Sequence, residues 1–510
     1  MKGIRGKISI IFFIIVLLFN FSSCSKKSVE RTKQDGMVFY EVFVRAFYDS
    51  DGDGIGDLKG LTQKLPYIKS LGVNGIWLMP VFKSPSYHGY DVSDYYNINP
   101  EYGTNEDFEN FINKAHELGI KVILDLVVNH TSSKHPWFLN ADSSPKSKYR
   151  DYYIWATQDT KLNEPSALGT KQWYNKGSGF YNAIFWSEMP DLNFDNKKVR
   201  KEIKKIAKYW LDKGVDGFRL DAAMHIYPPN RVQDTLNWWK EFGDYCRSIK
   251  KDVYLVGEVW SSERAIAPYL KYLDSCFNFK LAEGIIDAVI KGDSSKLQYN
   301  LPFIYDEYKN SYKDYVDAPF LTNHDMDRVM SKIDDVNKMK LAASILLTMP
   351  GNPFIYYGEE IGMKGEKPDE YIREPFKWGK EYVPGQTKWI DSEYNVGDYA
   401  PSVEEQDNDP KSLLNFYRDM IKFRLGNDIL SKGDITIIET QPEILAYYRA
   451  INNDKLFIVH NLTGNLVNTE LKLDQNDKLK GETLKGDGIV RIEDNKIKIN
   501  LKPYSTVIIK

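Results

Sequence analysis

The stretch Val122-Ile-Leu-Asp-Leu-Val-Val-Asn-His130 is the clearest indication of the fold, because an apolar run ends there in polar side chains. Val122–Val127 is short and apolar, which is typical of a strand buried on both faces of a parallel sheet. Residues just beyond such a strand lie at its carboxyl end, where α/β barrels carry their functional side chains. The stretch therefore predicts one strand of a parallel sheet, with a site at its end.

The same unit recurs from about Gly36 to Met363, where short apolar runs alternate with amphipathic helical stretches. This alternation is the pattern of βα units wrapped around a parallel sheet. The expected strands are Val38–Phe43, Gly75–Met79, Val122–Val127, Gly217–Leu220, Val253–Gly257, Leu273–Phe277, Pro319–Leu321 and Pro353–Tyr356. The expected helices include Asp107–Leu118, Val199–Lys213 and Arg231–Ile249. Eight strands fit a closed (β/α)8 TIM barrel of the α/β class.

Two further segments depart from this alternation and predict separate domains. The connection after the third strand is too long for a βα loop, which indicates a small inserted domain over residues 131–190. The final residues, 425–510, contain alternating runs and frequent Asn/Asp-Gly turns, which favour an antiparallel β-sandwich. The barrel is then expected over residues 36–130 and 191–424.

Composition excludes some classes of partner. The formal net charge is −3, from 68 basic and 71 acidic residues, and no Lys/Arg block stands out beyond the N-terminus. A nucleic-acid binder would carry a basic patch, so we expect no nucleic-acid partner. We favour a partner that carries no charge. Away from the N-terminus only Cys246 and Cys276 remain, too few for a disulfide framework, so the core must be stabilised by packing. We separately expect the protein to be a monomer.

The N-terminus is a targeting segment. Lys2, Arg5 and Lys7 precede the apolar run Ile8–Phe21, which is too short to span a bilayer comfortably. The run ends in Phe21-Ser-Ser-Cys24, which resembles a bacterial lipoprotein cleavage box. That resemblance implies a signal peptide over residues 1–23, lipidation of Cys24, a tether over 24–35, and a protein anchored to the membrane and facing outward. An ordinary secretory signal is the alternative.

Three more predicted strands end in polar residues as the first one does. The stretches that contain these strand ends are Gly217-Phe-Arg-Leu-Asp-Ala-Ala-Met-His225, Gly257-Glu-Val-Trp260 and Phe320-Leu-Thr-Asn-His-Asp325. One such carboxylate would most often cap the next helix. Together with Asp125-Leu-Val-Val-Asn-His130, in order on strands three, four, five and seven, they resemble the four signature regions of the α-amylase family, glycoside hydrolase family 13.

The resemblance implies roles that agree with the chemistry of a retaining glycosidase, which needs a nucleophilic carboxylate and a proton donor roughly 5–5.5 Å apart. Asp221 matches the nucleophile, Glu258 the acid/base, and Asp325 the carboxylate that stabilises the transition state. Arg219 lies two residues before Asp221 on the same side of the strand and can hold it ionised. Burial beside other carboxylates would raise the pKa of Glu258, as a general acid requires. His130 and His324 match the histidines that bind the transition state.

Further residues resemble those that hold the sugar. In Tyr87-His-Gly-Tyr-Asp91, Tyr90 matches the ring that stacks under the sugar at the cleavage site, and His88 is expected to bind substrate beside it. Asp369 and Arg373 have the spacing of a pair that binds the next sugar unit. Family members that release single glucose units usually carry Asp where this chain has Tyr87, so the substitution favours cleavage within starch, maltodextrins and related α-glucans.

The segment Met189-Pro-Asp-Leu-Asn193 lies between the forms typical of oligo-1,6-glucosidases and of neopullulanases. This places the chain in the intermediate group and keeps a transglycosylase, a cyclodextrinase or neopullulanase, and an oligo-1,6-glucosidase open as alternatives. From another class, a non-catalytic glycan-binding or transporter-associated protein on the same barrel is also open. Such proteins lose the catalytic carboxylates, whereas all three are present here.

A cation site is expected in the first loop, Asp49-Ser-Asp-Gly-Asp-Gly-Ile-Gly-Asp57. Alternating carboxylates around glycines can wrap oxygen ligands about a hard cation. The family resemblance implies Ca²⁺, with the side chains of Asp49, Asp51, Asp53 and Asp57 and the carbonyl of Ile55 as ligands. A solvated acidic turn is the alternative. The resemblance also implies a second Ca²⁺ site at Asn129, whose other ligands the sequence does not identify.

Overall fold

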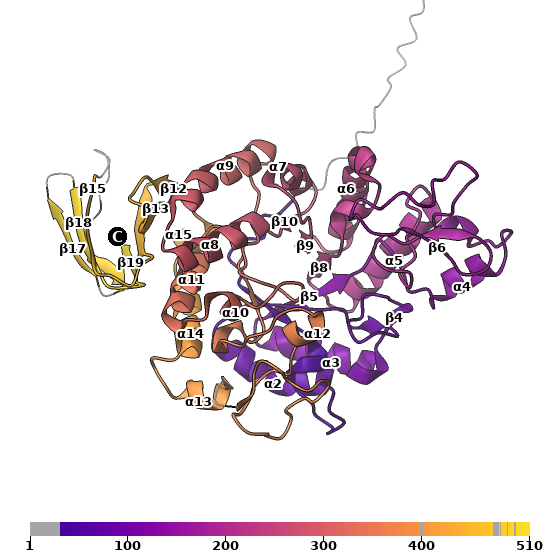
Figure 1. The fold of residues 1–510 in the computed structure, drawn as a ribbon, viewed down its shortest axis with the longest axis horizontal. Coiled ribbons are helices and arrows are strands. Elements are labelled where there is room, and N and C mark those ends of the chain that lie inside the picture. Colours follow the sequence, from indigo (N-terminus) through magenta and orange to yellow (C-terminus); the bar gives the residue numbers. More distant parts are fainter. Residues whose placement is uncertain (1–30, 398–400, 473–478, 480, 487, 494–495) are drawn as a thin grey trace, which may run out of the picture.

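A computed structural model of the chain describes residues 31–510 except 398–400, 473–478, 480, 487 and 494–495. Its centre is a parallel sheet in the order β10-β9-β8-β5-β2-β1-β11, surrounded by helices (Figure 1). The strands are β1 (Phe39–Val42), β2 (Gly75–Leu78), β5 (Lys121–Leu126), β8 (Gly217–Leu220), β9 (Tyr254–Gly257), β10 (Ser275–Cys276) and β11 (Phe354–Tyr356). Seven of the eight predicted strands are therefore present.

The eighth position of the ring is filled without a regular strand. The expected strand Pro319–Leu321 is wrong as a strand: the segment makes only two isolated parallel bridges, Phe277 to Ala318 and Phe320 to Phe354. These bridges join the β10 edge of the sheet to the β11 edge and so close the barrel. The predicted TIM-barrel class is confirmed. The barrel closes when this segment is in register with its two neighbours, and that does not require a full ladder of hydrogen bonds.

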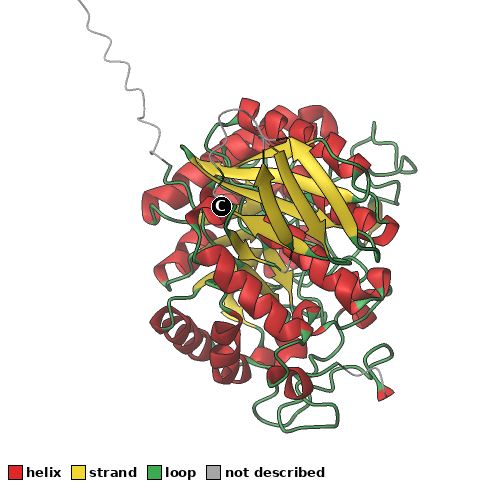
Figure 2. Cartoon of the chain, turned by 90° about the vertical axis from the view of Figure 1, so that its left-hand side faces the viewer, coloured by secondary structure: helices red, strands yellow, loops and turns green. Residues whose placement is uncertain are grey.

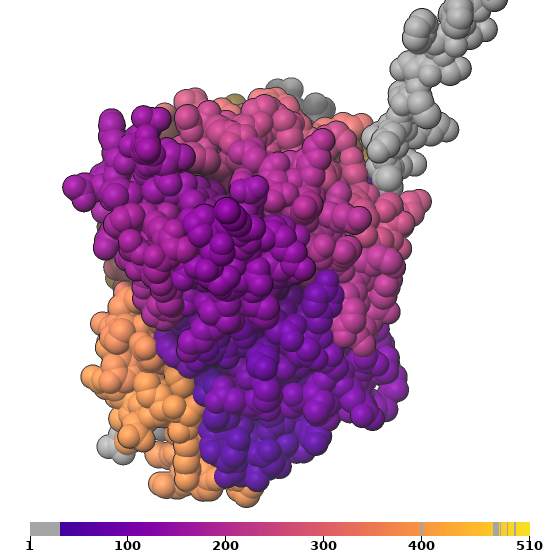
Figure 3. Space-filling view, turned by 90° about the vertical axis from the view of Figure 1, so that its right-hand side faces the viewer, coloured from indigo at the N-terminus to yellow at the C-terminus, as the bar shows by residue number. Residues whose placement is uncertain are grey.

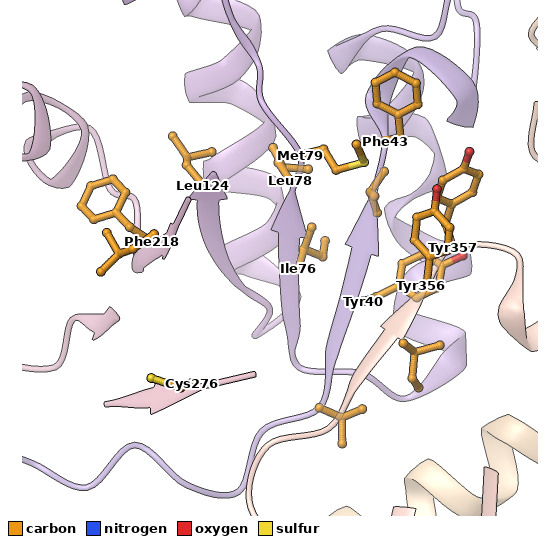
Figure 4. Packing of buried hydrophobic residues seen from close by; sticks show 14 of the residues in the cluster. Tyr40, Phe43, Ile76, Leu78, Met79, Leu124, Phe218, Cys276, Tyr356 and Tyr357 are labelled. Carbon is orange, nitrogen blue, oxygen red and sulfur yellow. The ribbon is translucent and has the colours of Figure 1, made fainter. Parts of the chain in front are cut away.

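The barrel strands are apolar because both of their faces are covered. Ile76 pairs in register with Tyr40 on one side and Val122 on the other, and all three side chains are buried. Figure 4 shows Tyr40, Ile76, Leu78 and their neighbours packed between the strands and the surrounding helices. Such continuous burial explains why these strands read as apolar runs rather than as alternating ones.

Amphipathic helices cover the outside of the sheet. The longer ones are α2 (Leu58–Leu71), α3 (Asn105–Glu117), α5 (Lys197–Asp212), α6 (Val232–Ile249), α8 (Phe279–Lys291), α9 (Ser295–Ser311), α11 (Val336–Thr348) and α14 (Leu413–Leu425). In α5, Asn196 caps the first turn, and residues three and four apart, from Val199 to Trp210, form its buried face. No helix of the described chain is apolar over a length that would cross a bilayer.

The insertion after β5 forms a separate lobe on the barrel, the violet lobe in Figures 1 and 3. It contains α4 (Pro136–Ser143) and the antiparallel pair β6 (Trp173–Asn175) and β7 (Phe180–Asn182). Its small core is aromatic: Phe138 packs edge-on against Tyr181 at 4.9 Å and stacks parallel to Trp155 at 6.0 Å. Trp155 is thus part of the aromatic core of the lobe.

The C-terminal residues form two antiparallel sheets, which face the viewer in Figure 2. One has the order β12-β13-β14-β19-β16 and the other β15-β18-β17. Their bounds are β12 (Asp434–Ile438), β13 (Ile444–Ile451), β14 (Asp454–Asn461), β15 (Val467–Lys472), β16 (Thr483–Lys485), β17 (Ile489–Glu493), β18 (Lys496–Leu501) and β19 (Thr506–Ile509). Alternate side chains, among them Phe457, Ile497 and Val507, meet in a core between the sheets. The predicted sandwich is confirmed.

Candidate active site

The predicted functional residues meet at the carboxyl ends of the barrel strands. Arg219 is inside β8, Asp221 follows it directly, and Glu258 follows β9. Asp325 lies just beyond the segment that closes the ring. These carboxylates open into a cleft of about 1290 Å³, whose walls also include His88, Tyr90, His130, Asp369 and Arg373. The structure thus brings together every substrate-binding residue predicted from the sequence, with Arg219 and His324 directly behind the lining.

Arg219 organises the centre of the site. Its side chain is 1% exposed and contacts three carboxylates. Nη1 lies 2.9 Å from Asp125 Oδ1 and 2.6 Å from Asp221 Oδ1, and Nη2 lies 2.7 Å from Glu258 Oε1. The two predicted catalytic carboxylates therefore share one guanidinium, which fixes their separation. A planar fork of donors suits this task better than the single ammonium of a lysine.

The charges of the site act on both predicted catalytic carboxylates. Burial raises the pKa of Glu258; Arg219 opposes this rise, and Asp221 and Asp325 add to it. The pKa of Glu258 is therefore shifted upward, the direction expected for a general acid. Burial raises the pKa of Asp221 as well, and Arg219 opposes only part of that rise. Arg219 thus acts on Asp221 in the expected direction, while desolvation acts on every carboxylate of the cluster in the opposite one.

A strained residue links the two catalytic positions. Ala222, next to Asp221, has φ 47° and ψ 39°, the left-handed region that non-glycine residues rarely adopt. Its backbone N–H donates to Glu258 Oε2 at 3.0 Å. The unusual conformation thus turns a backbone donor toward the predicted acid, and strain of this kind is held where function requires it.

His324 lies in a ring of acceptors. Nδ1 is 2.6 Å from Glu41 Oε1, and Nε2 is 3.0 Å from Asp325 Oδ2 and 2.5 Å from the Tyr90 hydroxyl. Burial lowers the pKa of His324, but Asp325 and Glu41 outweigh burial and raise it to about 9. The reciprocal effect of His324, with Arg373, holds the pKa of Asp325 well below its usual range despite burial. Glu41 was not identified from the sequence as a residue of the site. The available signal was a carboxylate inside the apolar strand Phe39–Val42.

A pH dependence of stability follows from His324. Its pKa rises from 6.5 unfolded to about 9 folded, so the imidazolium contributes stability fully below pH 6.5 and loses it as pH rises through about 9. We expect the free energy of unfolding to fall by on the order of 3 kcal/mol across this window. Denaturant unfolding at pH 6 and pH 9.5 measures it. The variant His324→Asn should show a smaller decrease; an equal one would contradict the assignment.

Arg373 holds Asp325 from the other side. Its Nη2 lies 3.0 Å from Asp325 Oδ1 and 3.2 Å from Asp369 Oδ2, and its Nε donates to the His324 carbonyl at 3.0 Å. Asp369, at the start of α12 (Asp369–Ile372), and Arg373 both line the cleft. Arg373 thereby joins the predicted outer sugar-binding pair to the carboxylate of the reaction centre.

The inserted lobe completes the wall beside His130. Asn129 donates to Asp191 Oδ1 at 3.0 Å, and His130 Nε2 lies 3.2 Å from the Tyr90 carbonyl. Burial raises the pKa of Asp191 to about 7, opposed by the hydrogen bonds from Ile184 and Asn129. Asp191 belongs to Met189-Pro-Asp-Leu-Asn193, so this segment holds Asn129 in place. The second Ca²⁺ site implied at Asn129 stays a prediction.

Several walls of the cleft were not predicted. Phe185 lies between His130 and His225, with ring centres 5.6 and 5.5 Å away, and remains 38% exposed. Trp186 and Trp260 also line the cleft, and Trp260 stacks on Phe279 at 4.5 Å. Isolated aromatic residues carry no signal in a sequence that distinguishes a core ring from a sugar platform.

Tyr87 is not among the residues that line the cleft. It stacks on Trp389 at 5.3 Å, and the guanidinium of Arg373 lies 5.9 Å from its ring centre. Tyr87 therefore lies beside Arg373, which with Asp369 is predicted to bind the next sugar unit. This agrees with a position just outside the cleavage site. The inference about cleavage pattern drawn from Tyr87 stays a prediction.

The acidic loop has oxygen donors that fit a hard cation. Carboxylate oxygens of Asp49, Asp51 and Asp57 lie within 4.8 Å of one another. Asp49 accepts backbone N–H groups from Gly52 and Gly54, and Asp57 caps α2 at Gly60, so the loop wraps around these carboxylates. Within the described chain, none of the three forms an ion pair with a basic side chain. Oxygen-only donors of negative charge suit Ca²⁺.

One predicted carboxylate lies outside that cluster. Asp53 is not one of its three members and instead accepts the Ile55 N–H at 2.7 Å. The roles of Asp53 and of the Ile55 carbonyl therefore stay predictions. Cys24, the predicted lipidation site, lies outside the described residues.

Comparisons with known proteins agree with this geometry. Residues 41–433 match the family described as "Alpha amylase, catalytic domain", and residues 444–508 match "Alpha-amylase SusG C-terminal domain". "Alpha-amylase 3" of Dictyoglomus thermophilum is 51% identical over 93% of both chains. A "4-alpha-glucanotransferase" of Thermotoga maritima is 37% identical over 84% of this chain and 96% of its own. The crystal structure of an alpha-amylase from H. orenii superimposes with a TM-score of 0.87, at 47% identity over 93% of this chain and 99% of that one.

Proposed function

The chain belongs to the α-amylase family and is a glycoside hydrolase, and on this premise we propose that it cleaves α-1,4-glucosidic bonds within starch and related α-glucans, with retention of configuration. The observation that carries the proposal is the position of Asp221 and Glu258 on one guanidinium at the base of the cleft. Two carboxylates held at a fixed short separation suit attack on the anomeric carbon by one and proton donation by the other.

The geometry gives each residue a task in a double displacement. Asp221 attacks the anomeric carbon while Glu258 protonates the glycosidic oxygen, so the leaving chain departs as a neutral alcohol and a glycosyl ester remains. Glu258, now a carboxylate, then takes a proton from water, which attacks the ester and releases Asp221. Arg219 stays between the two throughout. Asp325, kept ionised by His324 and Arg373, is placed to bind sugar hydroxyls as the ring distorts.

Cleavage within the chain is supported by the open cleft and by Tyr87. The walls continue past the carboxylates to Leu168, Trp186 and Val232, each more than 40% exposed, which leaves room for several sugar units. Transfer to a second sugar instead of water is the alternative, since the glycosyl ester is common to both reactions. Maltodextrins and starch are the expected substrates in either case.

Products from amylose and pullulan, with their initial anomeric form, test the proposal. We expect soluble starch to lose its iodine colour faster than reducing ends accumulate, and the first products to be α-anomers by NMR. Release of β-glucose one unit at a time would overturn both the retention and the internal cleavage. Longer oligosaccharides formed from a single pure maltodextrin would favour the transferase.

We further propose that the acidic loop binds Ca²⁺ through Asp49, Asp51 and Asp57, with Asp53 and the Ile55 carbonyl as additional ligands. The ion would neutralise three close carboxylates and hold the loop that begins α2. A chelator is then expected to lower the melting temperature, with a loss of about 2–3 kcal/mol relative to Ca²⁺ at a hundred times its Kd. Differential scanning calorimetry measures this.

Asp51→Asn should make the melting temperature insensitive to the chelator, whereas Asp159→Asn, an exposed carboxylate in the inserted lobe, should leave the response intact. Asp53→Asn shows whether the fourth carboxylate is a ligand. A wild-type melting curve that chelation leaves unchanged would exclude the loop site.

For location, we propose a lipoprotein anchored through Cys24 and facing outward, supported by the basic and apolar segments before it. Cells fed radiolabelled palmitate should incorporate the label into the wild-type chain and lose it in Cys24→Ala. Cys246→Ala, at a buried position, is the matched control and should retain the label. Label that persists in Cys24→Ala would remove the anchor.

A further inference from the structure

Glu41 is a carboxylate inside an otherwise apolar strand. All four residues of β1 are buried, and Glu41 itself is 1% exposed, in register with Trp77 of β2 and Tyr356 of β11. Burying an ionised carboxylate costs several kcal/mol unless a charged partner and hydrogen bonds compensate it. Glu41 is not among the residues that line the cleft, so contact with substrate does not explain it.

The partner of Glu41 is the ring of His324, and the surrounding groups fix the protons on that ring. Tyr90 lies 3.0 Å from Asp125 Oδ2, to which it donates its only hydrogen, so its oxygen is left to accept from His324 Nε2. Asp325 Oδ2, at 3.0 Å from the same nitrogen, also accepts. Glu41 Oε1 accepts from Nδ1. Because acceptors face both nitrogens, the ring carries a proton on each.

We propose that Glu41 is a positioning residue for the reaction: it accepts the Nδ1–H of His324, fixes the ring so that Nε2–H points to Asp325 and the Tyr90 hydroxyl, and supplies the counter-charge that keeps the ring cationic. The kinetic part of this inference rests on the proposed glycosidase function. Asp325 cannot do the same alone, because its oxygens are the ones placed to bind sugar hydroxyls. When Asp325 engages a sugar, Glu41 remains as the fixed anion behind His324.

Other charged groups act on the same ring. Asp325 adds an adjacent negative charge, and Asp125 and Asp221 add more distant ones from β5 and the end of β8. Arg219 and Arg373 oppose them from β8 and from the far side of Asp325. Glu41 is the only anion in contact with Nδ1 among the described residues, and it does not line the cleft. Replacing it therefore changes the ring without removing a group that contacts substrate.

Histidine-selective ¹⁵N NMR of the full chain tests the inference directly. The signal of His324 is assigned by its loss in His324→Asn. In the wild type we expect Nδ1 and Nε2 both protonated at pH 7.5, with a titration midpoint near 9. In Glu41→Gln, which keeps an acceptor but removes the charge, we expect the midpoint to fall by about two units, to near 7. Glu41→Leu should lower it further and release the ring orientation.

Glu360→Gln is the matched control. Glu360 is an equally buried carboxylate near the end of β11 that accepts from Tyr40 and Tyr67 and does not contact His324. Its substitution should leave the His324 midpoint unchanged. A His324 midpoint in Glu41→Gln equal to that of the wild type would overturn the inference, whether or not Glu41→Leu folds.

Kinetics on soluble starch supply the second readout. Glu41→Gln should lower kcat by roughly ten- to a hundred-fold at pH 8, with little change in KM, by analogy with the loss of other supporting carboxylates. The deficit should shrink at pH 6, where the ring is protonated without Glu41. A pH-independent deficit would indicate a merely structural role. Failure of the wild type to cleave starch would reject the proposed function, while the NMR titration would still decide the role of Glu41.

Discussion

Glu258→Gln and Asp221→Asn are each expected to lower kcat on soluble starch by at least about 10³–10⁴-fold, because each removes a group that acts as part of one unit. The amide in Glu258→Gln cannot protonate the leaving oxygen, and the amide in Asp221→Asn cannot form the glycosyl ester. Both substitutions keep the size of a side chain that contacts Arg219, so the melting temperature should stay near that of the wild type.

A substrate with an activated leaving group separates the two roles. From a nitrophenyl maltooligosaccharide the nitrophenolate departs without protonation, so Glu258→Gln should retain much of its rate of bond cleavage on this substrate, and Asp221→Asn should not. Glu283→Gln, an exposed carboxylate on α8, is the control and should behave as wild type. Near-normal starch cleavage by either variant, or the reverse response to the leaving group, would show that the roles are assigned wrongly.

Arg219→Met is expected to destabilise the fold by roughly 3–5 kcal/mol at pH 7.5 and to abolish activity, since it leaves Asp125, Asp221 and Glu258 buried together without their cation. The sign of the pH dependence follows from linkage. Without Arg219 the folded-state pKa values of these carboxylates rise further, so the folded protein takes up protons that the unfolded chain does not. The loss of stability should therefore shrink as the pH falls toward 5.

Thermal unfolding at pH 7.5 and pH 5 measures both effects. Arg231→Met is the matched control, because Arg231 makes ion pairs with Asp195 and Asp234 at the surface. Exposed pairs contribute at most about 1 kcal/mol, so this variant should melt close to the wild type at both pH values. A penalty for Arg219→Met that does not depend on pH would mean that lost packing, not charge, is responsible.

Local pattern was sufficient for the order and type of the barrel elements. Apolar runs of strand length and helical spacings of three and four are set by residues close together in the chain, and seven predicted strands appear where expected. The segment Pro319–Leu321 failed as a strand because closure of the barrel there requires only two bridges, a feature that depends on the neighbouring edges and not on the segment itself.

Sequence pattern alone was enough to identify the side chains at the ends of the strands, and hence the candidate site from Asp125 to Asp325. How these side chains share charge depends on the tertiary structure. It placed one guanidinium against Asp125, Asp221 and Glu258, and it brought Glu41 to His324 across 283 residues of chain. Residues this far apart along the chain share no periodic pattern in the sequence. Their contact across the closed barrel is set by strand register and by burial together. The electrostatics of the site, and with them the states of its acids and bases, are therefore properties of the fold.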